Sequence, residues 1–262
     1  MKTKTLLLKL SKKFPKRLAS KHHDYVGLMC GKLPNEINKI TLCLDFDESI
    51  FSDVIANRPD LIITHHPFIY GRKSKVLKFD ENKRNLVEKL EKMGIPVYSF
   101  HTNFDEGTGG MNDALAEKIG LLNITQLETD PMARGGVLPY AMNMEELTSY
   151  LCKKLNVSYG HYINCGKKVI KTMAIIGGGG WSSFRNAKLE NFDCYVSGDI
   201  PHHGRRSVIS EKYNYIDLPH EIENIFMERM RKILLDIDNN IEITVIYHEK
   251  NPYTKIVWVY EI

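Results

Sequence analysis

Apolar residues along the first hundred positions follow two patterns: short continuous runs, and recurrence at helical spacing. The runs at 40–44, 60–63 and 97–100 predict short buried strands. The intervening pattern predicts helices at 5–18 (interrupted at Pro15), 49–57 and 83–93, the last followed by a helix-ending glycine. Strands that alternate with helices of about 10–15 residues indicate parallel β-α units.

The same order of elements recurs later in the chain. A strand is expected at 170–176, a short helix at 181–187 and another strand at 193–196. Lys39 precedes Asp60 by 21 residues and Lys171 precedes Asp193 by 22, so the two blocks have nearly the same spacing. We interpret this as a degenerate internal duplication; the alternative is two ordinary β-α-β units that match by coincidence.

A polar segment with a proline and two glycines, 126–137, separates the two blocks. The other predicted elements are helices at 144–155 and 221–235 and strands at 241–247 and 255–260, joined by a turn at Asn251-Pro252. We therefore expect an α/β fold of two interleaved, duplicated halves with mostly parallel central sheets flanked by helices. The first half would take 1–125 and about 205–262, and the second 126–204.

The composition of the 262-residue chain, with 43% hydrophobic and 26% charged residues, is typical of a soluble globular protein. Its formal net charge of +4 is small, and part of it comes from N-terminal lysines that indicate a solvated face. Elsewhere the sequence has no basic stripe with interleaved aromatic residues, so direct nucleic-acid recognition is not the expected function.

The five cysteines are scattered without a C-x-x-C pair, which favours a reducing compartment over a disulfide framework. Cys43 and Cys194 lie in apolar runs and are interpreted as buried small hydrophobic residues. The N-terminus has no apolar stretch followed by a small-residue cleavage site, and no run reaches the roughly 18 apolar residues of a membrane span. We expect a soluble cytoplasmic protein without a membrane partner.

Two adjacent histidines, His65 and His66, follow the second predicted strand and directly precede Pro67. Alternate side chains of a strand point to opposite faces, so both imidazoles can share a site only where the strand ends, as it does here. The carboxyl ends of parallel strands are also where open α/β sheets place their sites. Taken alone, the pair would be read as a strand end satisfied by backbone hydrogen bonds.

Further candidate ligands follow the next strand. His101 and Asp105 lie just past 97–100, although Asp105 alone also fits a helix N-cap before the flexible turn 106–110. Together with His65 and His66, they make a mixed imidazole and carboxylate set. Zinc, iron, cobalt, nickel and manganese all bind such sets.

The second half adds His220 and Glu223. Pro219 stops the preceding strand, and the acidic residues after it begin a helix, on which these two side chains are three apart and face the same side. Another adjacent pair, His202 and His203, lies in a basic, surface-like stretch, and we rank it below the first.

With these residues the chain resembles the dinuclear-metal-centre proteins known as GTP cyclohydrolase 1 type 2 homologues, or the Nif-three-like family. The resemblance spans nearly the whole chain. The residues that carry it are Leu44-Asp45, 60–67 (Asp-Leu-Ile-Ile-Thr-His-His-Pro), 101–105 (His-Thr-Asn-Phe-Asp), 176–180 (Ile and four glycines), Ser182-Ser183 and 197–199 (Ser-Gly-Asp).

The resemblance implies two divalent metal ions per chain, bridged by a shared carboxylate, and a toroidal homohexamer whose sites face an internal cavity. Carried over by position, His65, His66 and Asp105 match metal ligands, and His101 lies in the site. The family pattern also expects a histidine followed four residues later by a glutamate. His220 fits the histidine, but Asn224 stands at the fourth position after it.

Two carboxylates remain available beside His220, Glu223 and Glu221. We favour Glu223 as the bridge, on a helix that starts in a slightly different register; the alternative is that one metal is bound weakly or lost. The ligand set does not select among zinc, iron, manganese, cobalt and nickel. The site would lie between the two halves of the chain.

Two metals about 3.5–4 Å apart activate water and clamp an oxyanion, the usual basis of hydrolysis. We therefore expect a metal-dependent hydrolase of a nucleotide-like or phosphorylated small molecule, with His101 transferring protons and GTP suggested by the family name only. The glycine run 177–180 either approaches a phosphate or, as we favour, forms a tight strand-to-helix turn. The alternatives are a metal-binding oligomeric scaffold or regulatory adaptor, and a metal-free binding module.

Overall fold

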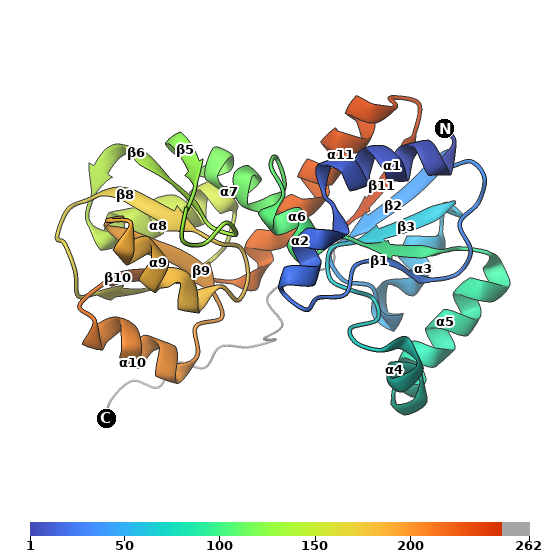
Figure 1. Ribbon diagram of the computed structural model, residues 1–262, viewed down its shortest axis with the longest axis horizontal. Helices are drawn as coiled ribbons and strands as arrows, with labels where there is room; N and C mark the ends of the chain where they lie inside the picture. Colours follow the sequence, from blue (N-terminus) through green and yellow to red (C-terminus); the bar gives the residue numbers. More distant parts are fainter. Residues whose placement is uncertain (248–262) are drawn as a thin grey trace.

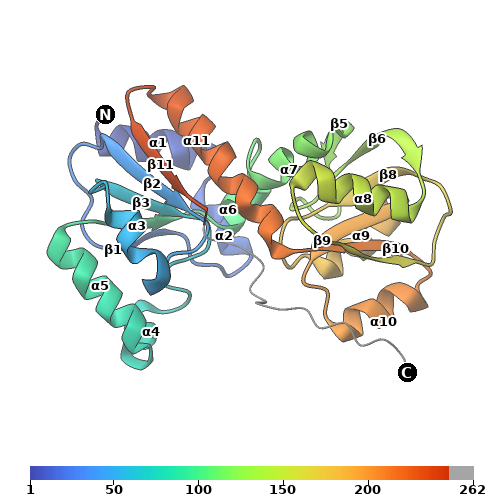
Figure 2. The ribbon, with the colours of Figure 1, turned by 180° about the vertical axis from the view of Figure 1, so that it is seen from behind.

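Two β-sheets organise residues 1–247, the part of the chain that the computed structural model describes. They stand side by side, each with helices on its faces (Figures 1 and 2), and we call each sheet with its helices the first half and the second half. Within the described residues, the first sheet has five strands in the order β1 (Gly27–Cys30), β4 (Val97–Ser99), β3 (Leu61–Thr64), β2 (Lys39–Cys43) and β11 (Glu242–Ile246). The second has six in the order β5 (Leu122–Gln126), β6 (Arg134–Met142), β8 (Ile170–Ile175), β9 (Cys194–Gly198), β10 (Asn214–Leu218) and β7 (His161–Asn164).

In the first half, β2, β3, β4 and β11 are parallel, and β1 is antiparallel at one edge. All of β3 is buried, as expected for a parallel strand covered on both faces. One face packs against α1 (Thr3–Lys13) and α11 (Ile225–Ile237), and the other against α3 (Phe51–Ile55) and α5 (Glu81–Met93). The remaining short helices are η1 (Glu48–Ile50), α2 (Lys16–Lys21), α4 (Lys73–Phe79) and α6 (Thr102–Glu106).

In the second half, β8, β9 and β10 are parallel, while β5, β6 and β7 pair antiparallel. Helices α7 (Met111–Ile119) and α8 (Met144–Leu155) pack on the face that shares its core with the first half. The other face carries η2 (Trp181–Ser183), α9 (Phe184–Leu189) and α10 (His202–Ser210). From β10 the chain passes through η3 (His220–Asn224) into α11, which starts between the halves and runs along the first sheet (Figures 1 and 2).

The two halves repeat one arrangement. The order β1-β4-β3-β2 of the first sheet matches β7-β10-β9-β8 of the second, in each case three parallel strands and an antiparallel neighbour. In each block the same hydrogen bond joins the lysine to the aspartate: Lys39 N donates to Asp60 Oδ2 at 2.9 Å, and Lys171 N donates to Asp193 Oδ2 at 2.9 Å. The matched Lys-to-Asp spacing in the sequence therefore corresponds to a repeated structural role.

The structure differs from the sequence prediction in the middle of the chain. The segment expected to separate the blocks contains the beginning of β5's partner strand, β6, which starts at Arg134. Gly135 and Gly136 both lie in this strand. No larger residue fits at either position, because a Cβ on Gly135 would meet the Phe192 ring at 2.1 Å and one on Gly136 would meet Leu122 O at 2.9 Å. Glycine inside a strand often marks such close packing and is easily mistaken for a loop signal.

The point where the chain returns to the first half also differs from the expected position near residue 205. Strand β10 pairs with β9 and β7 in the second sheet, so the crossing falls between Leu218 and Ile225. The strand expected at 255–260 and the turn at Asn251-Pro252 lie outside the described residues. Cys43 and Cys194 are buried in the cores, as expected, and all five cysteines are free. None of the helices found between residues 1 and 247 combines the length and the apolar character needed to cross a membrane.

Candidate metal centre

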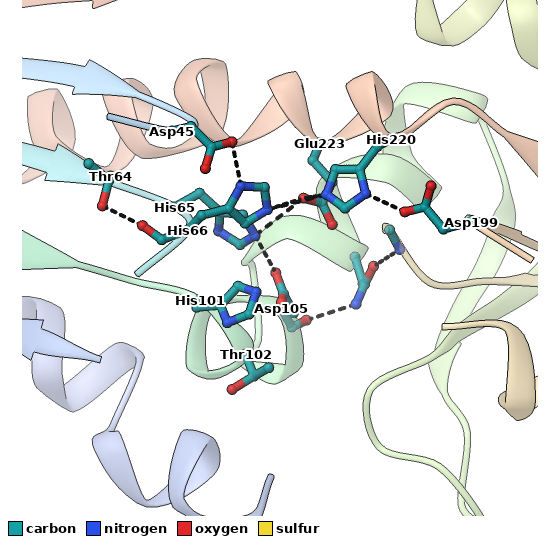
Figure 3. A network of polar contacts seen from close by, with 12 residues as sticks. Asp45, Thr64, His65, His66, His101, Thr102, Asp105, Asp199, His220 and Glu223 are labelled. Carbon is teal, nitrogen blue, oxygen red and sulfur yellow. Dashed lines mark hydrogen bonds and ion pairs between the residues drawn. The ribbon is translucent and has the colours of Figure 1, made fainter. Parts of the chain in front are cut away.

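Five side chains that the sequence singled out converge where the two halves meet (Figure 3). His65 and His66 follow the carboxyl end of β3, and Asp105 lies in α6, just after β4. His220 and Glu223 come from η3, which follows the carboxyl end of β10. The ends of parallel strands from both sheets thus supply one cluster, as open α/β sheets commonly do.

The adjacent histidines share the site because β3 ends at Thr64. The backbone N–H groups of His65 and His66 both donate to Leu44 O, at 3.1 and 3.0 Å, so the chain leaves the regular ladder at this point. Thr64 Oγ1 donates to the carbonyl of His66 at 2.8 Å and holds the turn. The two rings lie 5.0 Å apart, on the same side of the sheet edge.

Glu223 Oε2 occupies the middle of the cluster. It lies 2.9 Å from His66 Nε2, 2.9 Å from His220 Nε2 and 3.7 Å from His65 Nε2. The helical turn η3 is a 3₁₀ helix, in which side chains three residues apart stand over one another. This geometry brings Glu223, and not Asn224, onto the face of His220.

Glu221 points elsewhere. It lines a separate cavity of about 540 Å³, together with Asn224 and Tyr159, on the other side of η3. Of the two carboxylates considered beside His220, only Glu223 thus reaches the histidine cluster.

Asp105 and His65 form the second part of the cluster. Asp105 Oδ1 and His65 Nε2 lie 3.6 Å apart and are buried, and neither has a hydrogen-bond partner within residues 1–247. Leaving such a group unpaired costs about 1–3 kcal/mol. Two ligand atoms bonded at about 2.0–2.2 Å to one ion lie roughly 3–3.6 Å apart, so the separation fits a shared metal ion.

The charges of the side chains in the cluster compensate one another. Burial lowers the pKa of His65 well below its usual range, so this ring is neutral, as a metal ligand must be. Burial also works against charge on His66, but hydrogen bonds to Asp45 and Glu223 outweigh it and raise the pKa to about 10. Hydrogen bonds to Asp199 and Glu223 raise the pKa of His220 to about 11.

The two carboxyl groups respond in opposite directions. Burial and the nearby charge of Glu223 raise the pKa of Asp105 well above its usual range. Burial also opposes ionisation of Glu223, yet its hydrogen bonds with His220 and His66 hold its pKa well below the usual range. Two protonated imidazoles thus surround one carboxylate, at the place where the positive charge of a divalent ion would replace their protons.

A carboxylate lies behind each of three histidines. Nδ1 of His66 donates to Asp45 at 2.6 Å, Nδ1 of His220 to Asp199 at 2.5 Å, and Nδ1 of His101 to Asp24 at 2.7 Å. Metal-binding histidines commonly have such a partner, which fixes the ring and leaves Nε2 for the ion.

Sequence reasoning assigned no role to these three aspartates. Asp45 and Asp199 were visible only as parts of motifs, although each follows a parallel strand of a duplicated half. Asp24 gave no signal, because it lies 77 residues from His101 along the chain. Burial opposes charge on Asp24, but hydrogen bonds from His101 and Thr102 outweigh it and lower the pKa to about 2.

The cluster opens into a cavity of about 340 Å³. His101 and Thr102 line it from the first half, and Gly177 and Gly179 from the second. No Lys or Arg side chain from residues 1–247 contributes to the lining. His202 and His203 begin α10 and lie outside this lining, and His203 packs instead on Trp181, with ring centroids 5.1 Å apart.

Two groups of ligand atoms close enough to hold a metal ion occur in the described part of the chain: His65 with His66 and His101, and His66 with His220 and Glu223. Fold and site together define a class of protein: two similar α/β halves with a histidine and carboxylate cluster between them, suited to divalent metals.

The chain belongs to the Duf34/NIF3 (NGG1p interacting factor 3) family, whose model matches residues 1–252. A protein of Lactococcus lactis named GTP cyclohydrolase 1 type 2 homolog is 31% identical over 264 residues, covering 98% of this chain and 100% of that protein. A protein of the same name from Campylobacter jejuni is 31% identical over 231 residues, covering 88% of this chain and 90% of its own length.

Solved structures share the fold of this chain. A Bacillus cereus protein related to NIF3 superposes with a TM-score of 0.86 at 19% identity, covering 98% of this chain and 99% of that one, and so shows the shared fold. Reduced HcgD from Methanocaldococcus jannaschii has a TM-score of 0.78 at 27% identity, covering 94% of this chain and 97% of that one.

Proposed function

We propose that this protein binds two divalent metal ions at the cluster and is a hydrolase of a nucleotide-like or phosphorylated small molecule. One observation carries the proposal: Glu223 Oε2 lies close to imidazole nitrogens of three histidines. It lies 2.9 Å from both His66 Nε2 and His220 Nε2, and 3.7 Å from His65 Nε2, which itself is 3.6 Å from Asp105 Oδ1. A carboxylate shared in this way is the natural bridge between two ions.

The donor set fits the proposed ions. Three imidazole nitrogens and two carboxylates suit zinc, iron, manganese, cobalt or nickel, and the buried, unpaired atoms of His65 and Asp105 leave two ligand positions without another partner among residues 1–247. When bound, a pair of such ions supplies Lewis acidity that activates water near neutral pH and stabilises an oxyanion.

His101 is placed to move a proton in this reaction. Asp24 is ionised and only accepts hydrogen bonds, so Nδ1 of His101 carries a hydrogen and Nε2 is the nitrogen that can exchange a proton. The ring lies 5.1 Å from that of His65 and 5.6 Å from that of His66, and it lines the cavity. Thr102, next in the chain, donates to the same Asp24 oxygen at 2.7 Å and so keeps this carboxylate in position.

The cavity limits the substrate. Its volume of about 340 Å³ admits a small molecule or one end of a nucleotide. Because no Lys or Arg of the described chain lines it, a phosphate or other anion there has to be neutralised by the metals and by histidine. The name of the relatives makes GTP the first nucleotide to test.

We further propose that the chain forms a homohexamer, since this assembly is what the resemblance to the family implies. Mass photometry of the purified protein tests it directly, and a monomeric mass at micromolar concentration would reject it.

The decisive experiment measures metal content and turnover together. Protein stripped with chelator is reloaded with zinc, manganese, iron, cobalt or nickel and assayed with GTP and with bis(p-nitrophenyl) phosphate. We expect two ions per chain and metal-dependent turnover in the wild type. Glu223→Ala should lose at least one ion and the activity, because it removes the shared oxygen.

Glu221→Ala is the matched control, because Glu221 lies on the same 3₁₀ turn but faces the other cavity. This variant should keep both ions and full activity. Two bound ions without turnover on any substrate would reject the hydrolase and favour a metal-binding scaffold or regulatory adaptor. No bound metal at all would favour a metal-free binding module.

A further inference from the structure

Asn112 is fully buried in α7 and uses all of its side-chain polar groups. Its Nδ2 donates to the backbone carbonyls of Asp105, at 3.3 Å, and Met132, at 3.0 Å. Its Oδ1 accepts from the backbone N–H of Gly177 at 2.7 Å. One side chain therefore connects the helix that carries Asp105 with the glycine turn that follows β8 in the second half.

The glycine turn in turn contacts Glu223. Gly178 has a φ of +64°, and a Cβ built on it would lie 2.1 Å from Glu223 Oε1, so the carboxylate packs directly against the turn's backbone. Gly178 O also accepts from Gly198 N at 2.7 Å, just before Asp199, the partner of His220. The position of the turn is thus linked to Glu223 and His220.

Taken together, these contacts form one continuous series across the cluster. It starts at the backbone of Asp105, passes through Asn112 to Gly177 and Gly178, and ends on the carboxylate of Glu223. Asp105 and Glu223 are the two carboxylates proposed to hold an ion with His65, and they approach from different halves of the protein.

We propose that Asn112 is a positioning residue that sets the separation of Asp105 and Glu223 and thereby the geometry of the metal centre. The inference rests on the metal-binding part of the proposed function and is independent of catalysis. Asparagine suits the role because it donates two hydrogen bonds and accepts one from a planar group. Residues behind metal ligands typically change metal affinity about 10–100-fold when removed.

The protein contains a matched control in Asn214, which is also fully buried. Its Nδ2 donates to the carbonyls of Lys167, at 2.9 Å, and Asp193, at 3.2 Å, and its Oδ1 accepts from Gly166 N at 2.8 Å. The hydrogen bonds are of the same kind and number as those of Asn112, but they join segments at the start of β10, away from the cluster.

The test compares Asn112→Leu with Asn214→Leu, leucine being apolar and close to asparagine in size. Equilibrium dialysis against Co²⁺ gives the affinity, the visible spectrum of the Co²⁺ protein reports ligand geometry, and thermal melting of the metal-free protein reports stability. We expect both variants to lose similar stability. Only Asn112→Leu should bind Co²⁺ about 10–100-fold more weakly, with a changed spectrum.

Wild-type affinity and spectrum in Asn112→Leu, or an equal loss in Asn214→Leu, would overturn the inference. If the wild type binds no Co²⁺, the proposed metal centre itself fails, which separates that failure from this one. Should the leucine variants not fold, Asn112→Ser and Asn214→Ser serve in their place, because serine removes the reach to all three partners without adding volume. The same contrast between the two positions is expected.

Discussion

Replacement of Asp199 by asparagine tests whether the carboxylates behind the histidines serve a metal centre. Asp199 has a φ of 56°, a left-handed conformation that asparagine also adopts readily, so the amide fits the same turn. The substitution keeps the shape of the side chain. It removes the negative charge that His220 Nδ1 meets at 2.5 Å.

Two magnitudes separate a metal-binding role from a merely structural one. The Asp199 side chain is 55% exposed, and an ion pair this exposed contributes about 0–1 kcal/mol to folding. The free energy of unfolding of the metal-free protein should therefore change by less than about 1 kcal/mol. Loss of a partner behind a metal-bound histidine should instead cost about 10–100-fold in affinity, or about 1.4–2.7 kcal/mol of binding.

The assay pairs urea unfolding of the metal-free protein with equilibrium dialysis against Zn²⁺ or Mn²⁺. Glu211→Gln is the control, because Glu211 is the acidic partner of a surface ion pair with Arg185 and its change removes the same charge. Wild-type metal affinity in Asp199→Asn would refute the reasoning. An equal loss in Glu211→Gln would assign the effect to net charge instead.

Three further predictions follow from the same geometry. Because the ligands come from both halves, metal ions at about 100 times the Kd should raise the free energy of unfolding by about 2.7 kcal/mol per ion. Chelation should therefore lower the Tm, measured by calorimetry, by roughly 5–10 °C per ion. The Tm of Glu223→Ala should respond less to chelation. Gly178→Ala should lose metal, because its Cβ would lie 2.1 Å from Glu223 Oε1 at a φ of +64°. Gly179→Ala is the control: its Cβ would meet nothing within 4 Å, so it should keep the wild-type metal content by elemental analysis. Equal metal content in the two variants would contradict this prediction. The pKa of Asp24 is lowered from 3.8 to about 2, so its stabilising effect is present above pH 3.8 and lost as the pH falls to about 2. The difference in urea midpoint between wild type and Asp24→Asn should accordingly be full at pH 5 and shrink towards pH 2, and a difference independent of pH would argue against it.

The candidate site divides into residues that local pattern reveals and residues that it does not. His65, His66 and His101 were recognisable because each directly follows a run of buried strand residues, and strand ends in α/β sheets gather at one edge. Glu223 was preferred over Glu221 on spacing alone. The reason for that preference became visible only with η3, whose 3₁₀ geometry puts residues 220 and 223 on one face.

Other members of the site have no local signature. Asp24 lies in the loop between α2 and β1 and meets His101 only because α2 packs beside α6. Asn112 looks like any polar residue in the first turn of a helix until its three backbone partners, from separate segments, are known. Strand β6 was missed because Gly135 and Gly136 give a loop signal along the sequence, and only the Phe192 ring and the Leu122 carbonyl explain them.

The sequence by itself determined the α/β class, the repeat of Lys39 to Asp60 in Lys171 to Asp193, and the strand-end histidines, since periodicity, helix caps and strand-breaking residues act between near neighbours. Only the tertiary structure decided which carboxylate meets those histidines, which aspartates hold their rings, and where the chain crosses between the halves. Those choices depend on the packing of η3, α6 and the glycine turn against one another. Contacts between segments 65 to 157 residues apart, such as Asn112 with Gly177 and His66 with Glu223, leave no pattern that a window along the chain can detect.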